Sequence, residues 1–476
     1  MSQTTIAVIG AGFSGTLLSL HLLRRCGPGT QITLIERNSQ FGRGQAYSTG
    51  NASHVLNVPA GRMSAYHGQP THFLEWAQKR QGEASGDGGL AAGSFVPRRL
   101  YGDYIRALLK EELKRAPERR LDLLRGDVRA IDRSGARLGL HLDRGRVVHA
   151  DFAVLAVGNF PPASMPVADP SFYDTAFYRP DPWACDALAG LDPTAPVLLI
   201  GTGLTMVDVV ISLLDQGHAG PIYALSRRGL LPHRHASGAG QPIAAEHAFP
   251  TVLTELLRFM REEAQKARRA GANWQPIVDE IRPFMQDVWQ IMSPADKARF
   301  VRHLRPWWDV HRHRMAPAVA DRIEAARASG QLQIIAGRVQ SYAPEAGSVR
   351  IAYRPRGTDG VRTLAAARVI NCSGPTADYD RISDGLIRSL LADGTARPDF
   401  LRLGLDVTGT CALLSRSGAI SRRLFAVGPV TKGAFWEMTA VPDIRRQCEF
   451  LAQHLSGLVK PAAAAPAAER PLTFSI

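Results

Sequence analysis

Three glycines near the N-terminus have the spacing of a phosphate-binding turn. Gly10, Gly12 and Gly15 form a G-x-G-x-x-G motif directly after the apolar run at residues 6–9. In such a turn the first glycine permits the tight bend, the second leaves room for a pyrophosphate, and the third lets the next helix pack closely on the strand. Free N–H groups at the start of that helix attract the anion. The chemistry predicted here is the binding of a dinucleotide.

A carboxylate stands where the ribose of a dinucleotide is expected. The second apolar run, residues 32–35, ends in Glu36, which follows Gly15 by 21 residues. At that distance an acid accepts hydrogen bonds from ribose hydroxyls. A glycine motif alone is weak evidence, but a strand, the motif, a leucine-rich helix and a distant acid together predict a dinucleotide site.

The same pattern recurs 191 residues later with a different ending. Strand 197–200 precedes a second glycine turn, in which Met206 replaces the third glycine, and strand 222–225 ends in basic residues instead of an acid. Arginine pairs with phosphate through two parallel hydrogen bonds, so this site is expected to prefer NADPH to NADH. The residues predicted to bind this coenzyme are Gly201, Gly203, Thr205, Ser226, Arg227 and Arg228.

A further group of polar and aromatic residues could contact a substrate. It comprises Trp308, His311, Arg312, His313 and Arg314, together with Trp436 and Glu437. Its arginines suit an anionic substrate or the coenzyme phosphates. The alternative is a structural ion-pair cluster that joins a helical segment to the core, and the sequence favours neither over the other.

No metal site and no redox disulfide are expected. His233, His235, His311 and His313 are not accompanied by carboxylates at the spacing of a metal site. The five cysteines are scattered and form no C-x-x-C pair. This pattern argues against a disulfide reductase.

The composition is that of a globular protein with two or three domains. The chain has 476 residues, of which 45% are hydrophobic and 21% charged, and no apolar run is long enough for a membrane span. A cytoplasmic protein is therefore expected. The net charge of +14 comes from arginines spread along the chain, without a basic tail. This favours two anionic dinucleotides as ligands and argues against nucleic acid.

The order of predicted elements gives an α/β fold with two Rossmann-like dinucleotide-binding domains, each of three layers, and a helical insertion. Residues 1–160 are predicted to form the first part of one domain. Residues 161–366 form the second domain, with helices inserted at about 246–329. Residues 367–455 complete the first domain, and residues 456–476 are an alanine- and proline-rich tail that is expected to be flexible.

Several segments resemble the flavoproteins with two dinucleotide-binding domains. The closest resemblance is to a family of FAD/NAD(P)-binding proteins that is related to the flavin-dependent N-monooxygenases and the class B monooxygenases. The segments that carry it are residues 10–15, 42–49, 56–59, 201–208, 307–314 and 424–445. The resemblance implies that the first domain binds FAD and the second NADPH. The chain departs from the pattern at Met206, and at Pro429, where related proteins often have aspartate.

The resemblance also assigns residues to the FAD site. It implies that the three glycines of the first turn hold the pyrophosphate, Glu36 the adenosine ribose and Val128 the adenine through its backbone. Gly428 and the helix start near Val441 would approach the flavin end. The predicted FAD-binding residues are Gly10, Gly12, Phe13, Ser14, Gly15, Glu36, Arg37, Gly44, Ala46, Tyr47, Asn57, Val58, Arg62, Met63, Val128, Gly158, Gly428 and Val441.

The expected function is that of an FAD-dependent oxidoreductase. We expect an NADPH-dependent single-component monooxygenase that hydroxylates a small polar substrate with O2 through a C4a-peroxyflavin. Asn57, in a loop expected near the flavin ring, is the candidate catalytic residue, and an ordinary turn amide is the alternative. Two other functions stay open: an NAD(P)H-dependent flavin dehydrogenase or reductase with a non-oxygen acceptor, and a non-catalytic flavin-binding protein. The fold hosts many reactions, so the sequence does not predict the substrate.

Overall fold

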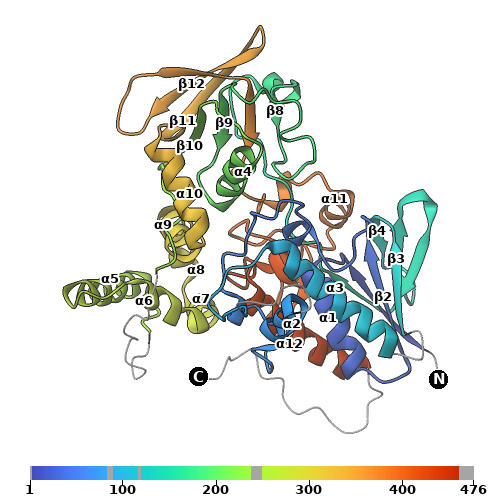
Figure 1. The fold of residues 1–476 in the computed structure, drawn as a ribbon. Coiled ribbons are helices and arrows are strands. Elements are labelled where there is room, and N and C mark those ends of the chain that lie inside the picture. Colours follow the sequence, from blue (N-terminus) through green and yellow to red (C-terminus); the bar gives the residue numbers. More distant parts are fainter. Residues whose placement is uncertain (1–2, 83–88, 116–119, 237–248, 460–476) are drawn as a thin grey trace.

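A mostly parallel sheet of six strands forms the centre of the first domain (Figure 1). The computed structural model describes residues 3–82, 89–115, 120–236 and 249–459. The strand order is β15-β16-β7-β1-β2-β3. Their bounds are β1 (Thr4–Ile9), β2 (Thr30–Glu36), β3 (Leu121–Arg125), β7 (Phe152–Leu155), β15 (Ala412–Leu414) and β16 (Ile420–Ala426). Because β16 pairs with β7 in parallel, the C-terminal segment returns to complete the domain that the N-terminus begins.

Helices and a small sheet surround these strands. Helix α1 (Phe13–Arg25) packs against α3 (Arg98–Arg115) and the last helix, α12 (Val441–Val459). An antiparallel sheet of β4 (Val128–Asp132), β5 (Leu138–Leu142) and β6 (Val147–Ala150) contacts β1, and α11 (Gly385–Ala392) packs on β4. Helix α2 (His72–Gly82) contacts α3. These layers bury the apolar strand residues that the sequence pattern marks as core.

The second domain has a seven-stranded sheet, in the order β13-β12-β11-β10-β9-β14-β8. Their bounds are β8 (Tyr178–Arg179), β9 (Val197–Ile200), β10 (Ile222–Ser226), β11 (Leu332–Glu345), β12 (Ser348–Pro355), β13 (Arg362–Ala366) and β14 (Arg368–Asn371). Helices α4 (Leu204–Asp215) and α10 (Pro317–Ala328) pack together on this sheet. The strand β14 lies after the boundary predicted at residue 366, yet it pairs with β9 and so belongs to the second sheet.

The helical insertion lies between β10 and α10. Its helices are α5 (Leu253–Arg269), α6 (Gln275–Glu280), α7 (Met285–Ile291), α8 (Pro294–Arg299) and α9 (Arg305–Arg312), with a π-turn, η6 (Phe300–Leu304), before α9. In Figure 1, α5 and α6 project to one side, below the second domain. Helix α10 falls within the predicted insertion at 246–329, but its apolar residues join the core of the second domain. Among the described residues, no helix combines the length and apolar character needed to cross a bilayer. The tail at residues 460–476 lies outside the described residues.

Candidate functional site

The first glycine turn leaves a bare helix start at the carboxyl end of β1. Gly10 has a φ of 104°, and a Cβ there would lie 2.4 Å from the carbonyl oxygen of Ala156. At Gly15 a Cβ would lie 1.9 Å from the carbonyl oxygen of Gly10, so a side chain would push α1 off the turn. Gly12 is the N-cap of α1, and neither a side-chain cap nor an acidic residue occupies the first turn. No side chain caps the first N–H groups of α1, which are therefore available to an anion.

A second loop closes over this helix start. Gly44, with a φ of 57°, approaches so closely that a Cβ on it would lie 3.0 Å from the Cα of Gly12. Tyr47, next along the same loop, contacts the ring of Phe13 at a centroid distance of 6.4 Å. Ala46 is exposed. A Cβ at Gly12 would fill the space between the loop and the turn, and this cradle fits a pyrophosphate.

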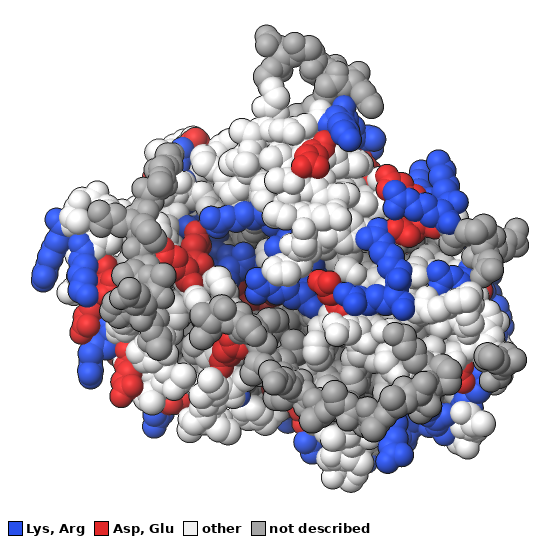
Figure 2. Space-filling model, turned by 90° about the horizontal axis from the view of Figure 1, so that it is seen from below, with Lys and Arg blue, Asp and Glu red and all other residues white. Residues whose placement is uncertain are grey.

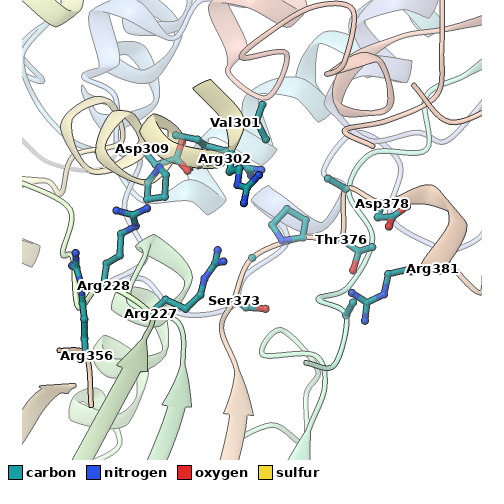
Figure 3. Close-up of a pocket in the computed structure, with 16 residues that line it drawn as sticks. Arg227, Arg228, Val301, Arg302, Asp309, Arg356, Ser373, Thr376, Asp378 and Arg381 are labelled. Carbon is teal, nitrogen blue, oxygen red and sulfur yellow. Dashed lines mark ion pairs between the residues drawn. The ribbon is translucent and has the colours of Figure 1, made fainter. Parts of the chain in front are cut away.

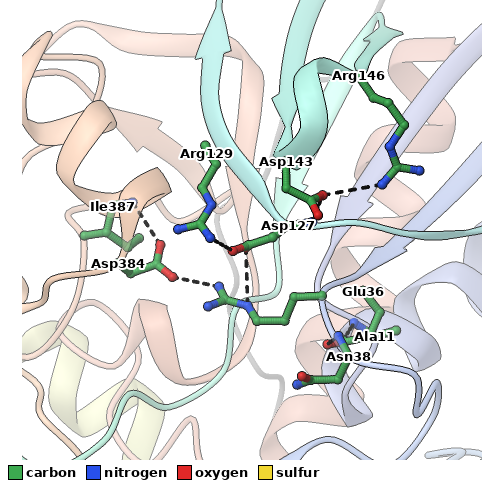
Figure 4. Close-up of polar contacts among 10 residues, drawn as sticks. Ala11, Glu36, Asn38, Asp127, Arg129, Asp143, Arg146, Asp384 and Ile387 are labelled. Carbon is green, nitrogen blue, oxygen red and sulfur yellow. Dashed lines mark hydrogen bonds and ion pairs between the residues drawn. The ribbon is translucent and has the colours of Figure 1, made fainter.

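Polar groups continue from the turn toward the start of β4 (Figure 4). The Glu36 carboxylate accepts hydrogen bonds from the N–H groups of Ala11 at 2.8 Å and Asn38 at 3.0 Å. Each of its oxygens keeps a lone pair that a ribose hydroxyl could use. Arg37 pairs with Asp384 at 2.7 Å and with Asp127 at 3.6 Å. It thereby joins the end of β2 to the residue that precedes Val128, the buried first residue of β4.

The C-terminal segment touches the other side of the turn. Gly428 has a φ of 81°, and a Cβ on it would lie 2.5 Å from Oγ of Ser14 at the start of α1. Its N–H donates to Gln447 of α12 at 2.8 Å. Val441, the first residue of α12, is buried, as is Met63. Gly158 also has a positive φ, 71°, with open space around its Cα. The structure thus brings together the predicted FAD residues of three distant segments.

The loop that carries Asn57 faces the insertion. The backbone carbonyl of Asn57 lies 3.0 Å from Nε2 of His235, and the neighbouring Val58 is half-buried. Arg62 is largely exposed and lies 3.8 Å from Asp279 of α6. Insertion and first domain therefore meet at the loop expected beside the flavin ring.

The second glycine turn repeats the geometry of the first. Gly201 has a φ of 110°, and a Cβ there would lie 2.4 Å from the carbonyl oxygen of Cys372, after β14. Gly203 is the N-cap of α4 and, as in α1, no side chain caps the helix and no acid occupies its first turn. Met206, in place of the third glycine, is fully buried in the core of the second domain, so it leaves the helix start open. The hydroxyl of Ser226 lies 2.9 Å from that of Thr202 and accepts a hydrogen bond from the N–H of Gly229.

An arginine-rich cavity of about 650 Å³ lies beside this turn, and we call it the arginine pocket (Figure 3). Arg227 and Arg228 follow β10, Arg302 comes from the insertion, and Arg356 follows β12. In Figure 3 these four side chains surround the open space. Among the described residues, none of the four has an ion-pair partner, whereas Arg305 lies 3.5 Å from Asp309. The pocket therefore suits a phosphate group.

A second cavity, of about 770 Å³, connects the arginine pocket with the first domain, and we call it the interdomain pocket. At one end lie Gly201, Gly203 and Thr205, and at the other lie Lys432 and Thr439, which come shortly before α12. Burial, together with nearby Arg305, lowers the pKa of the Lys432 ammonium group to about 8. Its Nζ lies 5.1 Å from the ring centroid of Trp436. Lys432 is thus a cationic side chain at neutral pH in the wall of the interdomain pocket.

The candidate substrate cluster is internally bonded. The buried side chains of Arg312 and Glu437 form an ion pair at 2.9 Å, and Nε1 of Trp308 donates to the other oxygen of Glu437 at 2.5 Å. Trp436 is buried and stacks on Trp289 at a centroid distance of 4.9 Å. These contacts join α9 and α7 to the C-terminal segment, which is the arrangement expected of a structural cluster.

The other three predicted members of the cluster, Arg314, His313 and His311, lie in different places. Arg314 pairs with Asp279 and donates to Gln275 of α6. His313 lines the interdomain pocket, where burial lowers its pKa. His311 lies on the opposite side of α9, 4.6 Å from His233 between ring centroids. Within the described part of the chain, no group of three or more His, Cys, Asp or Glu residues is arranged to hold a metal ion.

An ion pair and several hydrogen bonds join the two domains near the start of the Asn57 loop. Arg98 pairs with Asp208 of α4 at 2.8 Å, and both side chains are largely buried. Nε2 of His54 lies 3.0 Å from the Asp208 carbonyl oxygen and 2.9 Å from Oγ of Ser212. Asn51 donates to Asp215, at the end of the same helix, over 2.9 Å. The Asn57 loop of the first domain is therefore hydrogen-bonded along one face of α4.

Sequence reasoning missed several of these residues. Lys432, Thr439, Arg302 and Arg356 were not predicted as site residues, because they are distant from both glycine motifs in sequence. A lysine within the apolar segment before the last helix, and two arginines with i,i+3 spacing, Arg302 and Arg305, were the available signals.

Comparison with known proteins supports the fold. Residues 7–160 match the FAD-NAD(P)-binding family. Curated protein sequences give no significant match. Three solved structures share the fold of this chain. Each alignment covers 97% of this chain and 100% of the solved chain. They are ornithine hydroxylase (PvdA) from Pseudomonas aeruginosa at 14% identity and a TM-score of 0.66, L-lysine 6-monooxygenase from Pseudomonas syringae at 14% and 0.66, and ornithine N-hydroxylase (KtzI) from Kutzneria sp. 744 at 13% and 0.62. The predicted fold class is thereby confirmed, as is the resemblance to FAD/NAD(P)-binding proteins, and the chain resembles the flavin-dependent N-monooxygenases in its fold.

Proposed function

We propose that this chain is an FAD-dependent, NADPH-dependent monooxygenase that acts on a small polar substrate with O2. FAD would occupy the cradle between the first glycine turn and Gly44, and NADPH the interdomain and arginine pockets. When bound, FAD would accept the hydride and activate oxygen. The KtzI structure, which has the same fold, contains reduced FAD, NADP+ and L-ornithine together, and this supports a site for both cofactors in one chain.

One observation carries the proposal. The interdomain pocket is lined both by Gly201 and Thr205, at the start of α4, and by Lys432 and Thr439, which lie shortly before α12. A nicotinamide coenzyme with its phosphates at α4 would therefore extend toward the part of the first domain that Gly428 and Val441 place next to the FAD cradle. Two cofactors that meet end to end are what hydride transfer requires.

The chain's own residues would position and shield the reaction. The bare start of α1 binds the FAD pyrophosphate, and that of α4 the coenzyme pyrophosphate. Arg227 and Arg228 hold a 2′-phosphate. Arg305 and Asp309 of α9, and His313 directly after it, line the interdomain pocket, so this segment would limit the access of water to the reacting groups.

The cysteines support oxygen as the electron acceptor. All five lie in the described residues and are free thiols, and four of them are buried. Burial raises the pKa of Cys411 to about 12 and also raises the pKa values of Cys372 and Cys448. Protonated, separated thiols cannot accept electrons as a disulfide pair does.

The test is the stoichiometry of NADPH oxidation by the purified yellow protein. A monooxygenase and a peroxide-forming flavin oxidase both consume one O2 for each NADPH, so the fraction of that O2 recovered as hydrogen peroxide distinguishes them: it stays near one for the oxidase and falls for the monooxygenase when its substrate is present. Replacing Asn57 by Ala should release more of that oxygen as hydrogen peroxide, since we propose that its amide contacts the reacting group, whereas replacing the exposed Asn38 by Ala should not. Slow oxygen uptake together with fast reduction of a quinone dye would favour the flavin reductase instead. Absence of any NADPH oxidation would favour a flavin-binding protein.

A further inference from the structure

The helical insertion encloses an apolar groove of about 990 Å³, which we call the insertion groove. One wall is the apolar face of α5, including Leu256 and Met260. The other walls come from α6, α7 and α9, with Val278, Trp289 and Trp307 among them. A volume of this size fits a small organic molecule, and tryptophan and methionine side chains suit apolar ligands.

The groove is basic at its edge. Arg261 and Arg268 lie on the same side of α5 as its apolar face and line the groove, with Gln265 between them. Among its described lining residues there is no Asp or Glu, and neither arginine has an ion-pair partner within the described part of the chain. The acidic residues of α5, Glu255, Glu262 and Glu263, do not line it. Seen from below, the molecule exposes many Lys and Arg side chains (Figure 2), as its net charge of +14 implies. An anion is therefore favoured at the edge of the groove, and a cation is disfavoured.

The insertion groove is separate from the proposed cofactor pockets. Helix α9 divides them, because Trp307, Trp308 and His311 face the groove whereas Arg305 and Asp309 face the interdomain pocket. The indole of Trp308, bonded to Glu437, stands in the dividing wall. A ligand in the groove would thus lie outside the space assigned to FAD and NADPH.

We propose that the insertion groove is a binding site for a free, small apolar molecule with one anionic group. The apolar part contacts the α5 face and the tryptophans, and the anionic group pairs with Arg261 and Arg268. This site goes beyond the proposed function, because it requires neither FAD nor NADPH.

The test is calorimetric titration of the purified holoprotein with matched C10 compounds, without NADPH. Decanoate should bind one to one, 1-decanol more weakly, and decyltrimethylammonium and L-ornithine not measurably. The double variant Arg261→Gln/Arg268→Gln should weaken decanoate binding by about tenfold or more, as loss of charge-assisted bonds does, and leave 1-decanol unchanged. The matched control is Arg258→Gln/Arg269→Gln, which changes two exposed arginines of α5 that do not line the groove.

If the double variant misfolds, a substitution inside the groove tests the same binding site. Met260→Glu places a carboxylate inside the groove and should abolish decanoate binding while the far-ultraviolet circular dichroism stays unchanged. Equal binding of the cationic compound, or equal losses in the two arginine double variants, would overturn the proposal. So would a dimer in light scattering that Met260→Glu dissociates, because a second copy would then be the occupant. Failure of NADPH oxidation alone would count against the proposed function and not against the groove.

Discussion

The carboxylate of Glu437 and the guanidinium of Arg312 form an ion pair that is almost completely withdrawn from water. Nε and Oε2 lie 2.9 Å apart, and the side chains are 6% and 4% exposed for Arg312 and Glu437. Burial alone would raise the pKa of Glu437, but Arg312, His313 and the hydrogen bond from Trp308 outweigh it and lower the pKa to about 2. The pair holds the insertion on the first domain.

Replacing Glu437 by Gln should lower the free energy of unfolding by about 3 to 5 kcal/mol, because Arg312 would be left buried and uncompensated. Because the folded pKa lies below the ordinary value of 4.5, the contribution of Glu437 is present above that pH and is lost as pH falls toward 2. Urea denaturation at several pH values measures both effects. Glu324→Gln removes an exposed pair with Arg327 and should cost less than about 1 kcal/mol. Similar losses in the two variants would contradict the argument.

Replacing Gly12 by Val should remove most of the FAD from the purified protein. The added side chain would occupy the space between the first glycine turn and Gly44, where we place the pyrophosphate. The ratio of flavin absorbance to protein absorbance measures the effect. Gly27→Val is the control, since a Cβ at Gly27 meets nothing within 4 Å. A Gly12 variant that remains fully yellow would show that FAD binds elsewhere.

The double variant Arg227→Ala/Arg228→Ala should weaken NADPH binding by about tenfold or more and leave NADH binding nearly unchanged, because NADH lacks the 2′-phosphate. Fluorescence titration of the oxidised protein with each coenzyme gives the two dissociation constants. Arg362→Ala, at an exposed position on β13, is the control. An equal loss for both coenzymes would assign a structural role to Arg227 and Arg228.

Replacing Lys432 by Met should remove a pH dependence of NADPH binding. The ammonium group is charged below a pKa of about 8 and neutral above it, so the wild-type affinity for an anionic coenzyme should fall as pH rises through 8. In the variant the affinity should be lower at pH 7 and should change little up to pH 9. Lys266→Met, on exposed α5, should behave as the wild type.

Lys432 should also affect how the free energy of unfolding changes with pH. Because its folded pKa lies below the ordinary value of 10.5, the unfolded chain binds more protons between about pH 8 and 10.5. Stability of the wild type relative to the Met variant should therefore rise with pH in that interval. A parallel course of the two curves would show that Lys432 is fully solvated.

The fold could be predicted because its signals are local, whereas much of the site is not. Gly10 and Gly201 each lie between an apolar strand and a helix, so a short segment identifies each nucleotide site. The boundary near β14 could not be placed, since a short buried strand ended by glycine has the same pattern in either sheet. The arginine pocket escaped prediction because Arg302 and Arg356 come from the insertion and from the turn after β12, and only the folded chain brings them beside Arg227.

The contacts between the Asn57 loop and α4 fix the two domains relative to each other, and with them the proposed sites of the electron donor and acceptor. Arg98, His54 and Asn51 contact Asp208, Ser212 and Asp215 along about two turns of one helix, so a rotation of one domain against the other would break the Arg98–Asp208 pair and the hydrogen bonds beside it. We therefore expect the start of α4, which would carry the coenzyme phosphates, to keep its distance from the flavin cradle, so that the nicotinamide would be delivered and withdrawn by movement of the coenzyme within the interdomain pocket.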